Sequence, residues 1–190
     1  MEPLYPVPPS RRSIRRELLA RIRGEQTLSR MRRAGLRAPG PVSIAARVYI
    51  DEMFAWAITI GAHSRIAHDV RIIVHDAAVK HLTGYTEVRP VEIGESCYIG
   101  AGALILPGAT IGAGSIIGAG AVVRGDIPRG VVATGNPAKA VKHVTELRER
   151  HVTLQSAVTL FDKRPSDGLT ELEERAMRAV LARDGRLYVR

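Results

Sequence analysis

The chain has 190 residues, a length that fits one domain with extensions or two very small domains. Only 4% of the residues are aromatic and 18 are glycine, which argues against a sandwich or a doubly wound sheet because those folds usually contain more rings. The single cysteine, Cys97, excludes an intrachain disulfide and therefore a disulfide-stapled secreted fold.

The net charge of +9 is concentrated at the start of the chain. Residues 1–47 hold 11 Arg and 3 Glu, a net charge of +8, which leaves +1 for residues 48–190. The basic arm therefore says little about the main domain, and we predict no nucleic-acid partner. Residues 10–14 resemble a twin-arginine export signal, but charged residues occupy 15–23, where an uncharged segment should follow, so we expect a cytoplasmic protein.

The first predicted elements are two short helices in the basic arm. Ser13 can cap a helix that ends at Gly24, and Thr27 can start another that stops near Gly35. Arginine-rich helices usually present a solvated face. Docking on a neighbouring chain or contact with an anionic membrane surface is the alternative for this arm.

A six-residue repeat dominates the middle of the chain. Counting back from Val123 in steps of six gives isoleucine at every position to Ile93. The same spacing occurs earlier, where the predicted inward residues are Val42, Val48, Phe54, Ile60, Ile66 and Ile72. Neither a helical nor an alternating-strand period describes this spacing.

A second column of mostly small residues lies four positions after each aliphatic one, and glycine often follows the aliphatic residue directly. This pattern is typical of a hexapeptide solenoid, an all-β fold with glycine where the backbone turns. Cys97 falls in the small column, so we predict a core residue and not a nucleophile. The uncharged run over residues 96–123, long enough to span a bilayer, is predicted to lie inside the coil.

The two blocks of repeats are out of phase, and the break predicts a loop. From Ile72 to Ile93 is 21 residues, three hexads plus three, so a segment must leave the coil between Val74 and Val91. We place this loop at residues 75–90. Loops on a rigid scaffold commonly carry chemistry.

The sequence after the repeats predicts helices. One begins near Val144, and Ser166–Asp167 is predicted to open a stronger one that runs to Gly185. The predicted domains are a basic, largely helical arm at 1–41, a repeat domain at 42–143 with its loop at 75–90, and a helical extension at 144–190.

Several motifs together carry a family resemblance. They are the loop after Val74-His75-Asp76, Tyr98-Ile99-Gly100-Ala101, the run from Leu106 to Gly112, Asp126-Ile127-Pro128 and Gly135-Asn136-Pro137-Ala138. They resemble the left-handed β-helix acetyltransferases, most of all the maltose, galactoside and nodulation-type enzymes and the polysaccharide O-acetyltransferases. The resemblance implies a left-handed parallel β-helix with three hexads per turn and about four turns. It also implies a homotrimer that uses acetyl-CoA at sites between neighbouring chains.

The resemblance places the catalytic histidine on His75. A sugar hydroxyl is a poor nucleophile, and a neutral imidazole can accept its proton as it attacks a thioester carbonyl, with no acyl-enzyme. The residue that orients His75 stays open, with Asp76 and Glu87 as candidates. Asp51 stands where relatives have an acceptor-contacting asparagine, so we predict that it binds the acceptor.

The same resemblance predicts the coenzyme A contacts. The backbone amide of Ala101 is expected to face the tetrahedral oxyanion, while Arg124, Lys139 and Lys142 supply cations for the phosphates. The full predicted set is Ala101, Ala119, Arg124, Gly125, Lys139 and Lys142.

The remaining histidines leave other interpretations open. His63 and His68 have the spacing of two zinc ligands in γ-class carbonic anhydrases, but no histidine precedes His63, so we predict no metal. His81, His143 and His151 are predicted to be loop or solvated residues. The sequence therefore predicts an acetyl-CoA-dependent O-acetyltransferase acting on a sugar or glycan precursor. The alternatives are N-acetylation of an amino sugar, a non-catalytic scaffold, or a γ-carbonic-anhydrase-like protein.

Overall fold

The computed structural model describes residues 27–189, which form two compact units that divide after Val144. The predicted helix over residues 13–24 lies outside the described residues. Thr27 caps the first described helix, α2 (Leu28–Arg33), because its hydroxyl accepts a hydrogen bond from the backbone N–H of Arg30 at 3.2 Å. This start was predicted. No helix within residues 27–189 is long and apolar enough to cross a membrane.

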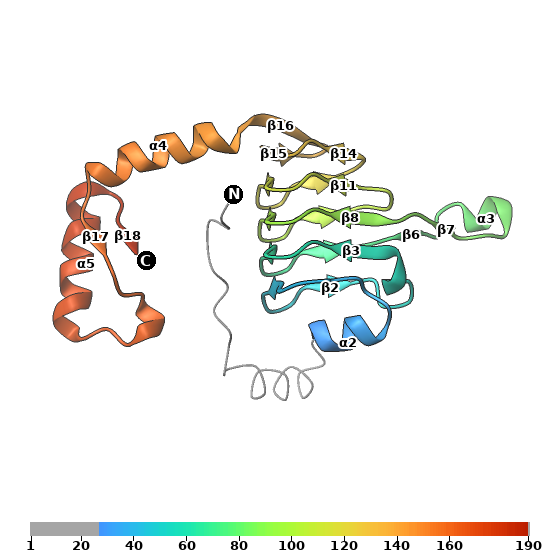
Figure 1. Cartoon of the computed structure of the whole chain (residues 1–190), viewed down its shortest axis with the longest axis horizontal. Coiled ribbons are helices and arrows are strands. Elements are labelled where there is room, and N and C mark those ends of the chain that lie inside the picture. The colour runs from blue at the N-terminus through green and yellow to red at the C-terminus, as the bar shows by residue number, and fades with distance from the viewer. Residues whose placement is uncertain (1–26, 190) are drawn as a thin grey trace. The chain divides into compact units, whose positions relative to one another are not determined.

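The first unit is a coil of short strands that pass in turn through three sheets (Figure 1). The first sheet contains β1 (Ser43–Ile44), β4 (Arg65–Ile66), β9 (Tyr98–Ile99), β12 (Ile116–Ile117), β15 (Val131–Gly135) and β16 (Ala138–His143). The second contains β2 (Tyr49–Ile50), β5 (Arg71–Ile72), β10 (Leu104–Ile105) and β13 (Val122–Val123). The third contains β3 (Ile58–Ile60), β8 (Val91–Ile93), β11 (Thr110–Ile111) and β14 (Asp126–Ile127). Only β15 and β16 pair antiparallel within these sheets.

The six-residue repeat appears as stacking between layers of the coil. Ile93 pairs with Ile111 and Ile99 pairs with Ile117, so equivalent residues lie 18 positions apart, which is three hexads per turn. These isoleucines are buried, as the sequence predicts. Each sheet stacks four layers of strands in parallel, and the first sheet adds a fifth.

The predicted phase of the earliest repeats, Val42, Val48 and Phe54, is wrong. The structure stacks Ile44 on Ile66, which lies 22 positions later and not 18. The extra residues follow β2, where residues 51–57 include a 3₁₀ helix before β3 begins. Counting back in sixes across this insertion misses the inward column by two residues. Val48 is buried all the same, because it stands in the second inward column, in line with Val70.

Glycine after an inward isoleucine is required by close stacking and not, as predicted, by a turn of the backbone. A Cβ atom on Gly100 would lie 2.5 Å from the backbone nitrogen of Ala119 in the next layer. The positive φ values of the corner turns belong to other glycines, such as Gly102 and Gly120, each with φ of 68°.

Cys97 is buried in the small column, as predicted. Its Sγ lies 3.3 Å from the carbonyl oxygen of Gly112, and burial raises the pKa of the thiol. A thiol that stays protonated and enclosed is a core residue and a poor nucleophile.

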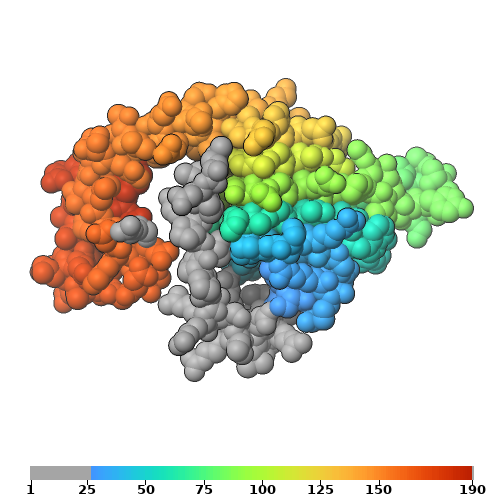
Figure 2. All heavy atoms as spheres, in the orientation of Figure 1, coloured from blue at the N-terminus to red at the C-terminus, as the bar shows by residue number. Residues whose placement is uncertain are grey.

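A loop leaves the coil between β5 and β8, where the phase break predicts it. It contains the antiparallel pair β6 (His75–Asp76) and β7 (Glu87–Val88), with the short helix α3 (Lys80–Thr83) at its tip. The loop projects sideways from the stacked layers and stands clear of their surface (Figures 1 and 2). Its root is closed by the backbone N–H of Arg89, which donates to the carbonyl oxygen of Val74 at 2.8 Å.

The second unit contains two helices and a small parallel sheet. Its elements are α4 (Val144–Ser156), β17 (Leu160–Phe161), the 3₁₀ helix Pro165–Asp167, α5 (Glu171–Asp184) and β18 (Tyr188–Val189). Helix α4 begins at Val144, where the sequence predicts a helix.

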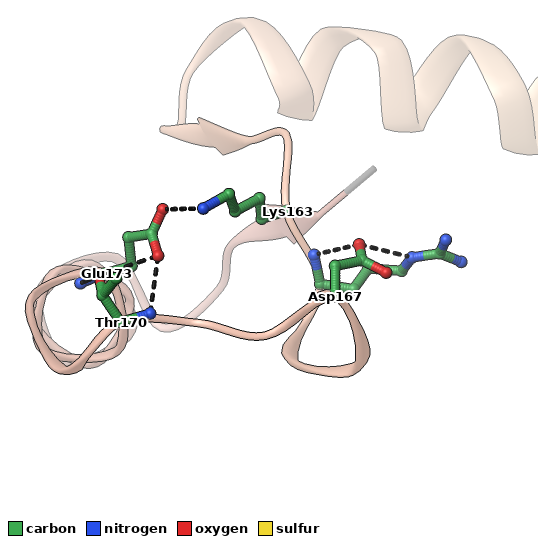
Figure 3. Close-up of polar contacts among 5 residues, drawn as sticks. Lys163, Asp167, Thr170 and Glu173 are labelled. Carbon is green, nitrogen blue, oxygen red and sulfur yellow. Dashed lines mark hydrogen bonds and ion pairs between the residues drawn. The ribbon is translucent and has the colours of Figure 1, made fainter.

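The predicted start of the last helix at Ser166–Asp167 is wrong. Helix α5 begins after Thr170, whose hydroxyl accepts from the backbone N–H of Glu173 at 3.2 Å. The Glu173 carboxylate in return accepts from the backbone N–H of Thr170 at 2.8 Å, which completes a capping box (Figure 3). The 3₁₀ turn that contains Asp167 ends at Gly168, whose left-handed φ of 81° separates it from α5.

We expect α5 to lose this cap in acid. Hydrogen bonds from Lys163 and from Thr170 lower the pKa of Glu173 from 4.5 to about 2. Because the pKa is lowered in the folded state, the stabilisation is complete above the unfolded-state pKa and is lost as the pH falls from about 5 towards 2. Helix content measured by circular dichroism should decrease over this range.

The Glu173→Ala variant should show lower helix content already at neutral pH, because alanine cannot accept from the backbone N–H of Thr170. Glu171→Ala is the matched control, because it removes a charge from the same helical turn without touching the capping box. Equal losses in the two variants would contradict the capping role and leave only the interaction of charge with the helix dipole.

Candidate active site

His75 lies at the corner where the chain passes from the second sheet to the third, here called the loop corner. At the other two corners the inward residues stay six positions apart in every layer. At the loop corner the two inward residues that flank the corner are separated by four to 21 positions, depending on the layer. The inward pairs that flank it are Ile50 and Ile60, Ile72 and Ile93, Ile105 and Ile111, and Val123 and Ile127. Every departure from the repeat in the described coil therefore falls at the corner that holds His75.

The imidazole of His75 is held by Asp51, which comes from the layer before it. Nδ1 of His75 is hydrogen-bonded to Oδ2 of Asp51, and the backbone N–H of Val74 donates to the same oxygen at 3.3 Å. Asp51 is only 1% exposed, whereas the His75 side chain is 31% exposed. Since an ionised carboxylate can only accept, this bond places a proton on Nδ1 and leaves the lone pair of Nε2 to accept a proton.

Asp51 is therefore the residue that orients His75, which the sequence analysis left open. The two candidates from the sequence make other contacts. Asp76 accepts a hydrogen bond from the backbone N–H of Ala78 at 2.7 Å, and Glu87 lies opposite Asp76 in the β6–β7 pair. The predicted contact between Asp51 and an acceptor stays a prediction.

Aromatic side chains from residues 51–57 lie beside His75, a feature that the sequence analysis missed. The Phe54 ring lies 5.4 Å from the His75 ring between centroids, at an angle of 55°. Trp56 meets Phe54 edge to face at 6.3 Å. The repeat count had assigned Phe54 to the inward column, so its place next to the histidine was hidden by the phase error.

The predicted coenzyme A contacts are divided between two corners of the coil. Arg124 and Gly125 lie at the loop corner. Ala101 and Ala119 stack on each other at the corner between the first and second sheets, where the backbone N–H of Gly120 donates to the Ala101 carbonyl at 2.8 Å. One chain therefore does not bring all these residues together.

The two predicted lysines lie on β16, the strand that ends the first sheet. Lys139 pairs in register with Thr134, and Lys142 pairs with Val132. Their predicted role in binding phosphates stays a prediction.

The histidines with zinc-like spacing do not meet. His63 follows β3 and His68 follows β4, so they lie at different corners of the coil. Within residues 27–189 no group of three or more His, Cys, Asp and Glu side chains is arranged to hold a metal ion.

Comparisons with known proteins bear on the repeat domain. Residues 90–125 match the family model described as "Bacterial transferase hexapeptide (six repeats)". The chain is 34% identical over 108 residues to "Putative acetyltransferase YvoF" of Bacillus subtilis (strain 168), covering 57% of this chain and 60% of that protein. It is 43% identical over 88 residues to a 2,3,4,5-tetrahydropyridine-2,6-dicarboxylate N-acetyltransferase of Staphylococcus saprophyticus, covering 45% of this chain and 37% of the relative. The chain spans 34% to 60% of the length of the curated relatives it matches.

A solved structure supports the same assignment. The maltose O-acetyltransferase from Clostridium difficile 630 has a TM-score of 0.50 and 26% identity, covering 67% of this chain and 83% of that chain. The chain thus carries bacterial transferase hexapeptide repeats, and its resemblance to the hexapeptide-repeat acetyltransferases is confirmed.

Proposed function

We propose that the protein is an acetyl-CoA-dependent O-acetyltransferase that modifies a hydroxyl of a sugar or glycan precursor, and that its coil is left-handed. The observation that carries the proposal is the His75–Asp51 pair at the root of a loop on a hexapeptide coil. The acetyltransferase relatives and the maltose O-acetyltransferase structure support it.

The geometry suits direct transfer from the thioester to the acceptor. Nε2 of His75 takes the hydroxyl proton as the acceptor oxygen attacks the acetyl carbonyl, and the carbon–sulfur bond then breaks. The departing sulfur recovers the proton from Nε2. The Asp51 carboxylate stabilises the imidazolium formed between these steps, and a backbone N–H such as that of Ala101 stabilises the oxyanion.

A complete site requires more than one chain under this proposal. The base and Arg124 lie at the loop corner, whereas Ala101 and Ala119 lie at another corner of the same coil. A closed homotrimer would bring the loop corner of one chain to the Ala101 corner of the next.

N-acetylation of an amino sugar is the second candidate, because one matched relative is described as an N-acetyltransferase. The same base can accept a proton from an amine. The two reactions differ in the bond that is formed, an ester in one and an amide in the other.

The test is incubation of the purified protein with acetyl-CoA and a panel of pyranosides and amino sugars, read by mass spectrometry. We expect an acetylated product that alkaline hydroxylamine reverses, because alkaline hydroxylamine cleaves oxygen esters and spares amides. A product resistant to hydroxylamine would establish N-acetylation. Absence of any product, together with absence of acetyl-CoA binding by calorimetry, would contradict the enzyme proposal.

A further inference from the structure

We infer that Trp56, together with Met53 three positions before it, forms a platform that binds the apolar face of a pyranose ring in the acceptor. This inference rests on the proposed function, since it assigns the surface next to the proposed base. It adds a chemical class, a six-membered sugar ring, to an acceptor that the sequence leaves unspecified.

The first observation is that the platform lies in an insertion, residues 51–57, that the coil does not require in order to turn this corner. The third layer turns the same corner within a single hexad, from Ile105 to Ile111. The first layer uses ten positions, from Ile50 to Ile60, and part of this longer segment projects outward. Met53 is 75% exposed and Trp56 is 57% exposed. Two large apolar side chains exposed on one short segment beside a proposed active site form a candidate contact surface.

The second observation is that the backbone end of the Trp56 side chain is held in place by close packing. A Cβ atom on Gly35 would lie 2.8 Å from the Cβ of Trp56, so the start of this side chain is tightly packed against the end of α2. Glu52, which precedes Met53, is engaged by Arg30, whose Nε donates to Oε1 at 2.7 Å. The outward surface of the segment is therefore apolar and anchored, which lowers the entropy lost on binding.

The third observation is continuity with the proposed base. Trp56 contacts Phe54, and Phe54 contacts His75, so three rings follow one another across the first two layers of the loop corner. Phe54 is half-buried and packs against the core, which leaves Trp56 and Met53 as the outer surface. A ring held by Trp56 would therefore lie at the end of a row of rings that leads to the imidazole.

The chemistry of a pyranose fits such a surface. Its axial C–H groups form an apolar face that stacks on an indole, while its hydroxyls point outward from the ring edge. One edge hydroxyl can then reach Nε2 of His75 while the ring rests on Trp56. An acyclic polyol or a hydroxy amino acid has no such face and gains nothing from the platform.

The experiment uses the fact that the chain contains one tryptophan, so its fluorescence reports on Trp56 alone. The full-length protein is titrated with methyl pyranosides and, in parallel, with sorbitol and serine. We expect pyranosides to shift the emission to shorter wavelength and to protect it from acrylamide quenching, while sorbitol and serine leave it unchanged. Unchanged emission with a pyranoside that the enzyme acetylates would overturn the inference.

Kinetics of variants give an independent readout. Trp56→Ala should raise KM for the acceptor about three- to tenfold, more than it lowers kcat, and Trp56→Phe should restore most of the loss. Tyr98→Ala is the matched control, because Tyr98 is a 46% exposed aromatic residue on β9, away from the loop corner, and its loss should leave KM unchanged.

The outcomes separate this inference from the proposed function. Pyranoside binding seen by fluorescence without acetyl transfer would support the platform and contradict the enzyme. Acetyl transfer with equal acceptor KM in wild type and Trp56→Ala would support the enzyme and overturn the platform. A smaller assembly for Trp56→Ala in light scattering would also overturn it, since the surface would then be a contact with a second copy of the chain.

Discussion

Replacing His75 by alanine is expected to lower kcat about a hundred- to ten-thousand-fold, a loss of about 3 to 5 kcal/mol of transition-state stabilisation. The reason is geometric as well as chemical. His75 is a partly exposed imidazole at the loop corner with its Nδ1 engaged by a buried carboxylate, so Nε2 is the nitrogen available to a substrate. Initial rates with acetyl-CoA and an identified acceptor measure the effect.

The control for this variant is His81→Ala, which changes a second histidine of the same loop. His81 lies in α3 at the exposed tip and should lose far less activity. The His75→Ala protein should keep its assembly and its affinity for coenzyme A. Turnover within threefold of wild type in His75→Ala would contradict the assignment.

Asp51→Asn is expected to lower kcat by about a hundredfold or more with little change in acceptor KM. Asparagine matches the shape of aspartate, and its side-chain oxygen can occupy the position that accepts from both the backbone N–H of Val74 and Nδ1 of His75. The proton then stays on Nδ1, and Nε2 keeps its lone pair. The negative charge that stabilises the imidazolium in the transition state is lost, which lowers kcat.

The expected signature of Asp51→Asn separates stabilisation of the His75 imidazolium from contact with an acceptor. Nitrogen NMR of the imidazole should show the proton on Nδ1 in both proteins, which would assign the loss of kcat to the missing charge. Asp76→Asn serves as the control, because Asp76 follows His75 in β6 but its carboxylate accepts from the backbone N–H of Ala78 in the loop. A rise in acceptor KM with unchanged kcat would instead establish the predicted acceptor contact for Asp51.

Sequence periodicity predicts the part of the fold that repeats, and it fails where the repeat is interrupted. The spacing from Ile93 to Val123 predicts the stacked layers because each isoleucine meets the same neighbours one turn later. The loop is also predicted, since its length breaks the phase between two regular blocks. The insertion at residues 51–57 goes undetected because Phe54 is aromatic and imitates an inward residue.

The His75–Asp51 pair could not be read from spacing for a related reason. The two residues are 24 positions apart, and only the true phase of the first layer places Asp51 at the loop corner. Family resemblance pointed to both positions but assigned Asp51 to the acceptor. The start of α5, in contrast, can be predicted from local sequence, because Thr170 and Glu173 have the residue types and the spacing of a capping box.

In the described coil, the number of residues between inward positions varies at the loop corner alone. The coil can therefore accept segments of different length at this corner while its other two corners stay regular. Each layer touches only the layers directly above and below it, so a change at that corner does not propagate through the stack. The part of the first-layer segment after Asp51, residues 52–59, can therefore be exchanged for one of different length. Ile50 and Ile60 then keep their partners, Ile72 and Ile93, and Asp51 keeps its bond to His75. A chain built in this way can acquire a new acceptor preference without a new core, which makes the first-layer segment the natural target for redesigning specificity.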